Sequence, residues 1–453
     1  MAEETASGRP STQSLGMVLT EDRERVSSTF DIDKEVNKDE SMDYEEKRIM
    51  LKLGNFKSAL LLFQGTVGLA LFTMQKPLQM VGLAWGTVIT IIAGYVTSYG
   101  LIVLNEIANE LEADFNHKRK IKNFDELTRQ ITGTSVLVVK WMMMISGVCM
   151  MYASSVSNIL LISTHLSRTL VMNEVAVKLI IFVVIALIFL VLVEPEKIQY
   201  INVYMTALLL SLAYLILGKN TYRWINGQGP GLSNINLMDL RYTGVYAGNI
   251  AYGFEVASNY LSLRLTASNE VKYGRLTSWM MVFVGINFYL CAAGHMVAYP
   301  GSQITENTFE MQKHEGPFWS NLIYPFMINT LYTFTFNTIF TGEIIESIPA
   351  LHRTMVNQKG TFDRTKLTLF RIIIWGVAVF VSVYATNIVY ILNFSGSVFT
   401  PIISYFGPLY LLYSYAAQKG KTVTVGRKIH DTLYVLIALG ISGWGIYNAF
   451  TSG

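Results

Sequence analysis

The segment SALLLFQGTVGLALFTMQKPLQM, residues 58–80, is apolar along most of its length, yet it carries Gln64-Gly65-Thr66-Val67-Gly68 near its middle. Its length suits a helix that crosses the hydrocarbon core of a bilayer, which takes about 20 residues. Two glycines and a threonine at mid-membrane favour a break in that helix, which exposes backbone groups that must bind something. Such breaks form substrate sites in many secondary transporters. Close packing of helices through small residues explains the same glycines equally well.

The rest of the chain repeats this apolar character. Hydrophobic residues make up 51% of the 453 positions, charged residues only 15%, and the mean hydropathy is +0.37. Further apolar segments follow the first at the length of a membrane-spanning helix, so the sequence predicts an all-α polytopic membrane protein with about 11 transmembrane helices. The predicted spans are residues 58–80, 83–105, 135–164, 177–194, 198–218, 242–263, 276–299, 318–345, 367–387, 389–415 and 430–450.

The N-terminal region differs from everything that follows. Residues 1–57 hold 13 acidic and 9 basic residues and few large apolar ones. This composition predicts that residues 1–56 form a disordered cytosolic tail, and that residues 57–453 form the membrane domain. The tail lacks the basic stretch and apolar core of a cleavable signal peptide, so the first span is expected to direct insertion.

The distribution of Lys and Arg predicts the orientation. With a cytosolic N-terminus, 18 of these residues fall in cytosolic connections and 7 in the opposite ones. The positive-inside rule therefore places the N-terminus in the cytosol and the C-terminus outside. The sequence leaves open whether the membrane is the plasma membrane or a vacuolar or lysosomal type.

Several classes of function are not expected. A net charge of +3 offers no footprint for nucleic acid, and no motif of a soluble enzyme is present. Cys149 and Cys291 lie inside apolar runs at no metal-ligand spacing, so neither a metal site nor a cofactor is expected. The lipid bilayer is the evident partner, and the sequence does not point to a protein partner.

A second break is predicted in span 242–263, at Tyr252-Gly253-Phe254-Glu255. A charge at mid-membrane costs at least about 2.5–3.5 kcal/mol, so Glu255 should face a cavity or a partner. It would serve as a proton carrier or a cation counter-charge; the alternative is a structural glutamate, neutral or paired with a neighbouring helix. The two breaks fall in the first helices of two successive five-helix sets, which would be inverted relative to each other.

Span 318–345 carries a polar stripe. Its members, at spacings of 3, 4 and 4 on one helix face, are Thr330, Thr333, Asn337 and Thr341. The stripe would line a water-filled path or hydrogen-bond to neighbouring helices, and both interpretations remain open. Glu343 lies on another face and is a second candidate for ion coupling, whereas Glu346 is expected to snorkel to the cytosolic surface.

At these residues the chain resembles the amino acid/auxin permease family, the transmembrane amino acid transporters, and within it the proton-coupled amino acid transporter branch. The resemblance covers residues 57–450. It is carried by Gly65–Phe72 ("GxGLLxLP"), Gly147–Tyr152 ("GFCxxY"), Tyr252–Glu255 ("FAFEG"), Gly396-Ser397 followed by Pro408 ("GS…P") and Glu343-Ile344-Ile345 ("EII"). The chain departs from these motifs at Phe72 and Ser262, which replace prolines, and at Val256, which replaces a glycine.

The resemblance implies a LeuT-like 5+5 inverted repeat plus one extra helix. It also implies symport of amino acids with H⁺, or with Na⁺ in some branches. The substrate-binding residues that it implies are Gly65, Thr66, Gly68, Tyr152, Tyr252, Gly253, Phe254, Gly396 and Ser397, and the candidates for ion coupling are Glu255 and Glu343.

Two functional hypotheses follow. The first is a secondary active transporter for amino acids that works by alternating access, coupled to H⁺ through Glu255. The second is a family member without transport activity that acts as a nutrient sensor or as a structural subunit of a membrane complex. The altered motifs at Phe72 and Val256 motivate this alternative.

Overall fold

The computed structural model describes residues 53–114, 120–131, 133–191, 195–231, 234–268, 271–313, 315–346, 348, 351, 354–355, 363–385 and 387–451. The predicted tail, up to position 52, lies outside these residues. So do Lys118, Arg119, Arg353 and Lys359, which contribute to the orientation argument, and the orientation stays a prediction. The described residues form helices, with one isolated bridge between Leu53 and Ala267.

A helix or an interrupted helix lies on each predicted span. The continuous ones are α5 (Leu83–Asp114), α7 (Thr134–Leu170), α8 (Glu174–Val191), α9 (Pro195–Ile225), α12 (Tyr273–Ala298), α15 (Ile323–Glu346), α17 (Arg364–Tyr384) and α20 (Val425–Thr451). Short helices in the connections are α6 (Phe124–Arg129), η3 (Leu240–Tyr242), η4 (Gly301–Gln303), α13 (Thr308–Gln312) and α14 (Pro317–Ser320).

Within the described residues, eight helices are long and apolar enough to cross a membrane, judged by length and composition. The predicted spans 177–194, 242–263 and 318–345 are not among these eight and lie on α8, on a broken pair of helices and on α15. The predicted all-helical membrane architecture is confirmed, and the number of crossings stays a prediction.

Three predicted spans are interrupted helices. They are α3 (Asn55–Val67) with the 3₁₀-helix η1 (Gly68–Phe72) and α4 (Gln75–Val81), then α10 (Thr243–Phe254) with α11 (Ala257–Thr266), and α18 (Ile388–Thr400) with the π-helix η5 (Pro401–Phe406) and α19 (Gly407–Gln418). Gly68 ends α3 with a φ of +35°, a conformation that glycine adopts without strain. Glu255 and Val256 separate α10 from α11. The two predicted breaks are therefore confirmed.

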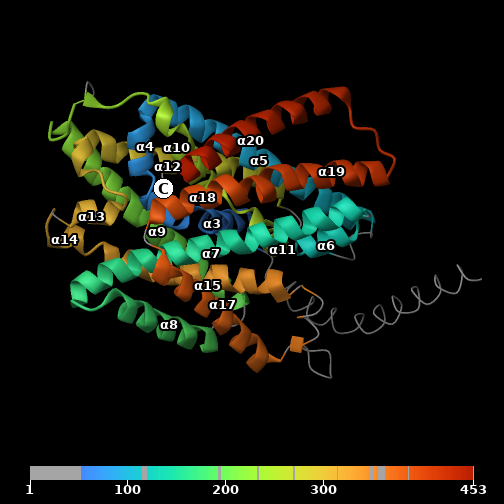
Figure 1. Ribbon diagram of the computed structural model, residues 1–453, viewed down its shortest axis with the longest axis horizontal. Helices are drawn as coiled ribbons and strands as arrows, with labels where there is room; N and C mark the ends of the chain where they lie inside the picture. Colours follow the sequence, from blue (N-terminus) through green and yellow to red (C-terminus); the bar gives the residue numbers. More distant parts are fainter. Residues whose placement is uncertain are drawn as a thin grey trace, which may run out of the picture.

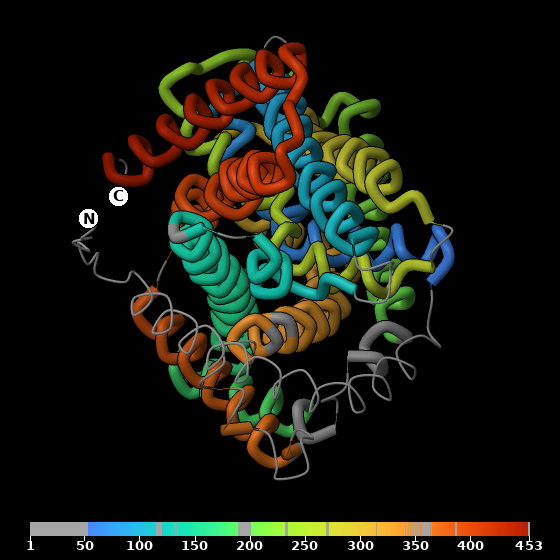
Figure 2. Tube along the Cα trace, turned by 90° about the vertical axis from the view of Figure 1, so that its right-hand side faces the viewer, coloured from blue at the N-terminus to red at the C-terminus, as the bar shows by residue number. Residues whose placement is uncertain are grey.

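The interrupted helix α3 lies in the middle of the bundle. Most long helices run along the horizontal axis of Figure 1 and are seen nearly end-on in Figure 2. In both views α7, α8, α15 and α17 lie on one side of α3, whereas α5 and α20 lie on the other.

Hydrogen bonds between helices hold α7, α8, α15 and α17 together, and we call these four helices the scaffold. The Tyr152 hydroxyl of α7 donates to the Ile374 carbonyl of α17 at 3.1 Å. The buried Lys178 ammonium of α8 donates to the Ser382 carbonyl of α17 at 2.8 Å. Contacts to backbone carbonyls of this kind fix both the separation and the register of neighbouring helices.

A buried ion pair joins α15 to α17. Glu346 Oε1 lies 3.1 Å from Arg371 Nε, and the side chains are only 9% and 4% exposed. The prediction that Glu346 snorkels to the surface is therefore wrong. Arg371 supplies a partner from the neighbouring helix, so the carboxylate remains inside the bundle, where removing either partner would leave an uncompensated charge.

Helices α10 and α18 approach each other backbone to backbone. A Cβ atom on Gly396 would lie 1.9 Å from the Gly248 carbonyl oxygen, and one on Gly248 would lie 2.0 Å from Asn393 Oδ1. Only glycine fits at such contacts, which resemble the small-residue packing of other membrane helices. This close contact fixes α10, the first half of span 242–263, against α18.

Large apolar side chains cover the outside of the bundle. On α8, for example, Leu179, Val183 and Leu187 are 57%, 55% and 57% exposed. They recur at helical spacing, so they form one outward apolar face. A face of this kind is stable against lipid and not against water, which agrees with a membrane-embedded chain.

We expect Gly396→Ala to destabilise the protein, because the added methyl group would overlap the Gly248 carbonyl. Overpacking of this kind costs about 1–3 kcal/mol. The matched control is Gly443→Ala in α20, where nothing lies within 4 Å of the new Cβ position. Thermal unfolding of the purified protein in detergent should show a lower Tm for Gly396→Ala alone. Equal Tm values for the two variants would contradict the close approach.

Candidate functional site

A small cavity lies where the two broken helices meet the scaffold. Its volume is about 30 Å³. Its walls come from α3, η1, α7, α10 and α15 and from the link between α10 and α11. The lining residues are Gln64, Gly65, Thr66, Val67, Gly68, Leu69, Met150, Met151, Ser154, Tyr252, Glu255, Thr333 and Asn337.

The broken end of α3 forms one wall. The helix ends at Val67, so its last carbonyl groups lack the partners that a continuing α-helix would provide. The C-terminus of a helix carries a partial negative charge and attracts cations such as an ammonium group. Gly65 brings this end close to α11, because a Cβ atom there would lie 3.2 Å from Leu263 Cδ1 and 3.3 Å from Val256 Cγ2.

Glu255 lines the cavity and also caps α11. Its Oε1 accepts a hydrogen bond from the Ser258 backbone N–H at 2.9 Å, and its Oε2 accepts one from the Ser258 hydroxyl at 3.2 Å. The side chain is 5% exposed, and among the described residues no Lys or Arg forms an ion pair with it. The N-terminus of α11 therefore provides the positive end that stabilises this carboxylate.

Neutral polar side chains complete the walls. Gln64 donates from Nε2 to the Thr333 hydroxyl at 2.9 Å and accepts at Oε1 from Thr206 at 3.3 Å. Asn337 donates to the Ser154 hydroxyl at 2.8 Å. These bonds connect α3 with α9 and α15, and α15 with α7. The side chains that line the cavity therefore also join the surrounding helices to one another.

The polar stripe of α15 divides into two parts. Thr333 and Asn337 line the cavity, whereas the hydroxyls of Thr330 and Thr341 donate to carbonyls one turn back in their own helix, at 2.9 and 2.8 Å. The hydrogen bonds to neighbouring helices are made by Thr333 and Asn337, the same two members that line the cavity, whereas a water-filled path along the stripe stays a prediction. The side chain of the other candidate on this helix, Glu343, lies outside the described part of the chain.

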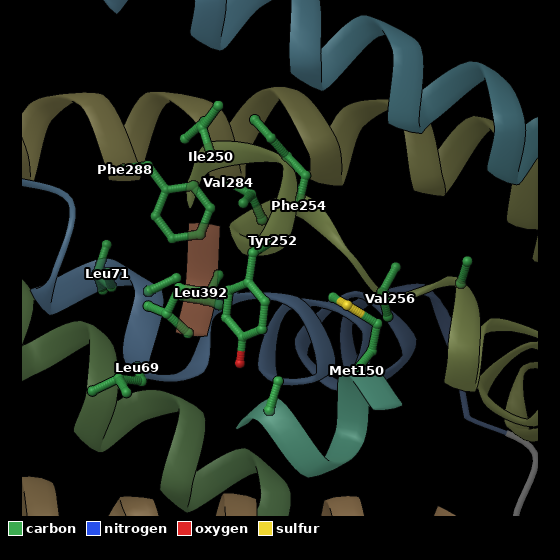
Figure 3. Close-up of a cluster of buried hydrophobic side chains, with 14 of the residues drawn as sticks. Leu69, Leu71, Met150, Ile250, Tyr252, Phe254, Val256, Val284, Phe288 and Leu392 are labelled. Carbon is green, nitrogen blue, oxygen red and sulfur yellow. The ribbon is translucent and has the colours of Figure 1, made fainter. Parts of the chain in front are cut away.

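The structure brings five of the sequence-predicted residues to the cavity. They are Gly65, Thr66, Gly68, Tyr252 and Glu255. Figure 3 shows how α10 separates its aromatic residues: Tyr252 points toward Met150 of α7, whereas Phe254 points away, on the side of Phe288. The ring centroids of Phe254 and Phe288 are 5.7 Å apart.

The other predicted residues lie elsewhere. Tyr152 hydrogen-bonds to α17, and Gly253 packs against Met74 and Phe288. Gly396 and Ser397 belong to the contact between α18 and α10, where Ser397 Oγ would lie 2.4 Å from a Cβ atom on Gly248. None of these four, nor Phe254, lines the cavity.

Sequence reasoning missed Ser154 and Met150 and Met151. All three lie on α7, within one turn of each other, and line the cavity. A serine in the small-residue run Ala153-Ser154-Ser155 offered a weak signal, because small polar residues are common wherever membrane helices pack.

Phe72, which departs from the resembled motif, belongs to an aromatic cluster beyond the cavity. Its ring centroid lies 5.0 Å from that of Phe309 and 4.7 Å from that of Phe326. The ring therefore packs η1 against α13 and α15. We call the rings of Phe72, Phe309 and Phe326, which cover this end of the site, the aromatic plug.

An ion-pair network closes the opposite end. Arg264 of α11 donates to Glu112 of α5 at 2.7 and 3.0 Å and to Asn105 at 3.0 Å. The Ile121 backbone N–H also donates to Glu112, at 3.0 Å. The Leu53 N–H donates to the Thr266 carbonyl at 2.8 Å, which ties the chain just before α3 to the end of α11.

Two solved transporter structures share this fold. One is the substrate-bound, outward-open state of a Na⁺-coupled sialic acid symporter, with a TM-score of 0.54 and 11% identity over 88% of this chain and 90% of that one. The other is the manganese transporter of Eremococcus coleocola, crystallised with an aromatic bis-isothiourea compound, with a TM-score of 0.52 and 14% identity over 87% of this chain and 85% of that one. The chain therefore has the LeuT-like fold that the family resemblance implied.

The sequence also identifies the family to which the chain belongs. Residues 52–451 match the family described as "Transmembrane amino acid transporter protein". The chain belongs to this family of membrane transport proteins. No curated protein matches its sequence.

We expect Glu255→Ala to lower the stability of the protein and Glu255→Gln to lower it less. Alanine leaves the Ser258 N–H without its cap, which costs about 1 kcal/mol, whereas glutamine keeps one acceptor oxygen. Thermal unfolding of the purified variants in detergent measures the difference. If Glu255→Ala were as stable as the wild type, the carboxylate would not act as a cap.

Proposed function

We propose that this protein is a secondary active transporter that moves amino acids across a membrane with H⁺, by alternating access. The observation that carries the proposal is the cavity at the two helix breaks, which combines the open end of α3 with the buried carboxylate of Glu255. Family membership supports amino acids as the substrate class. The finer assignment to a proton-coupled branch rests on the Gly147–Tyr152 and Tyr252–Glu255 motifs.

The substrate would bind through its backbone groups. The carbonyls near Gly65, Thr66 and Gly68 would accept hydrogen bonds from the ammonium group, and the N–H groups of the broken segments would donate to the carboxylate. Tyr252 and Asn337 line the same space and would limit the size of the amino acid side chain.

Binding must enlarge the site. A volume of about 30 Å³ accommodates about two water molecules and not an amino acid. The plug at Phe72 closes one end and the pair of Arg264 with Glu112 closes the other. Access would therefore alternate: movement of η1 opens the first end, and movement of α11 opens the second.

Glu255 would couple proton movement to this change. As a carboxylate it caps α11 through both oxygens. Protonation would remove the negative charge that faces the helix N-terminus and weaken the cap. The proton would thus loosen α11 in the state that binds substrate, and its release would restore the cap after the substrate has left.

The cellular setting follows the same proposal. The N-terminus would be cytosolic, and the protein would reside in the plasma membrane or in a vacuolar or lysosomal-type membrane, where a proton gradient is available. Na⁺ is the competing coupling ion, and it would be held by unwound backbone carbonyls at the C-terminal end of a half-helix such as α3.

Uptake into proteoliposomes tests the function. Purified full-length protein is reconstituted and given a panel of labelled amino acids, with and without an inward pH gradient. We expect accumulation of one or a few amino acids only when the gradient is present. Accumulation that requires Na⁺ would overturn the coupling assignment, and no uptake by folded protein would favour a sensor or a structural subunit.

We expect Glu255→Gln to abolish accumulation driven by the pH gradient while exchange of labelled for unlabelled substrate continues. Glutamine preserves the shape of the site but carries no titrating proton. The control is Glu310→Gln, which removes an exposed carboxylate paired with Arg168 at the surface. Normal gradient-driven accumulation by Glu255→Gln would show that protons are coupled elsewhere.

A further inference from the structure

A second, larger cavity lies beyond the aromatic plug. Its volume is about 300 Å³, at the lower end of the range for small-molecule sites. Its walls come from α4, the connection between α9 and α10, the end of α12, and η4. The lining residues are Lys76, Gln79, Met80, Pro230, Asn234, Ile235, Asn236, Asp239, Tyr242, Met296, Tyr299, Gly301 and Ile304.

Lys76 gives this cavity a cation that forms no ion pair with a carboxylate of the described residues. Its ammonium donates to the neutral Gln79 Oε1 at 3.2 Å. No carboxylate of the described residues lies within ion-pair distance, although Glu306 is near enough to interact with its charge. The other basic residues beside this cavity differ, because Arg223 pairs with Glu315 and Arg241 with Asp239, both at 2.6 Å.

Tyr299 provides an aromatic wall of the cavity. Its side chain is 2% exposed, and its hydroxyl lies beside the side chains of Gln312 and Glu315, which do not line the cavity. The ring is held in place, since the Arg223 guanidinium lies 4.4 Å from its centroid and the His295 ring stacks on it at 6.2 Å. The ring therefore offers a fixed apolar surface at this wall of the cavity.

The remaining walls suit an apolar group. Met80, Ile235, Met296 and Ile304 all line the cavity, and Ile235, Met296 and Ile304 are buried in the protein. On the opposite rim, Asn234 and Asn236 are exposed, so the cavity lies beside solvent. Asp239 and the amide oxygens of the rim offer acceptors for an ammonium group.

We propose that this cavity is an outer binding site for an α-amino acid with an apolar side chain, whose carboxylate pairs with Lys76. The proposal rests on the function proposed above and adds a second site to it. Along span 58–80 the order is the central cavity, then Phe72, then the outer cavity. The outer site would hold substrate on the far side of the plug and load the central site when η1 moves.

Equilibrium binding tests the outer site. Tritiated L-leucine is bound to the full-length protein in lipid nanodiscs, and bound ligand is counted per chain. We expect Lys76→Gln to remove one bound leucine per chain, or to weaken its affinity at least about tenfold, as expected when a charged hydrogen bond worth about 1.5 kcal/mol is lost.

The controls separate this site from the central one. Lys313→Gln removes an exposed positive charge outside the cavity and should leave leucine binding unchanged. Asn337→Leu alters the central cavity and should leave the Lys76-dependent leucine in place. The amine 3-methylbutylamine, which is leucine without its carboxylate, should not compete for that molecule.

Each possible result bears on either the outer site or the proposed transport function. Leucine binding that is insensitive to Lys76→Gln, or equally sensitive to Lys313→Gln, overturns the outer site and leaves the proposed transport function standing. Leucine binding that disappears only in Asn337→Leu does the same. Gradient-driven uptake by the wild type together with no leucine binding at all rejects the outer site alone, whereas the absence of uptake of any amino acid rejects the transport function.

Discussion

One constraint governs this molecule: a backbone polar group inside a bilayer must find a partner within the protein. Continuous helices meet it by themselves, but α3 and α10 both end in the middle of the bundle. Two local features provide partners for the backbone groups at these helix ends. α3 passes into a 3₁₀-helix at Gly68, and α11 receives a cap from the carboxylate of Glu255. Both features bring polar groups to the same small cavity, which explains the position of the candidate site.

Glu255 caps a helix, and in the proposed mechanism it also carries the coupled proton. An isolated carboxylate at this depth would be costly, yet here the helix that it caps supplies its stabilisation. Because the same interaction depends on the negative charge, the position of α11 becomes sensitive to the charge on Glu255. A lysine or arginine partner would have held the carboxylate ionised and removed that sensitivity. In the proposed mechanism, a helix N-terminus in place of a basic side chain leaves Glu255 able to change protonation.

The sequence predicted the breaks because they depend on local chemistry. Glycine at position 68 and a charge at position 255 are unfavourable in a continuous membrane helix wherever that helix lies. The sequence could not predict which helix faces pack against each other. Tyr152 and Ser154 are two residues apart on α7, and only packing decides that the first reaches Ile374 while the second reaches Asn337. Gly396 was likewise assigned to the substrate although it packs against Gly248, since close packing and ligand approach both require glycine.

The interactions across the bundle indicate which parts would move together. The scaffold is joined by a buried ion pair and by bonds to backbone carbonyls, which resist sliding. The described hydrogen bonds between α3 and its neighbours α9 and α15 are neutral ones at the Gln64 side chain and the Leu60 carbonyl, and such bonds contribute only about 0.6 kcal/mol on average between membrane helices. α10, in contrast, meets α18 through glycine contacts that leave no room for displacement. Movement of the first half of the broken pair would therefore carry α18 with it, and the π-helix at Pro401, just beyond that contact, is the place where α18 could bend relative to α19.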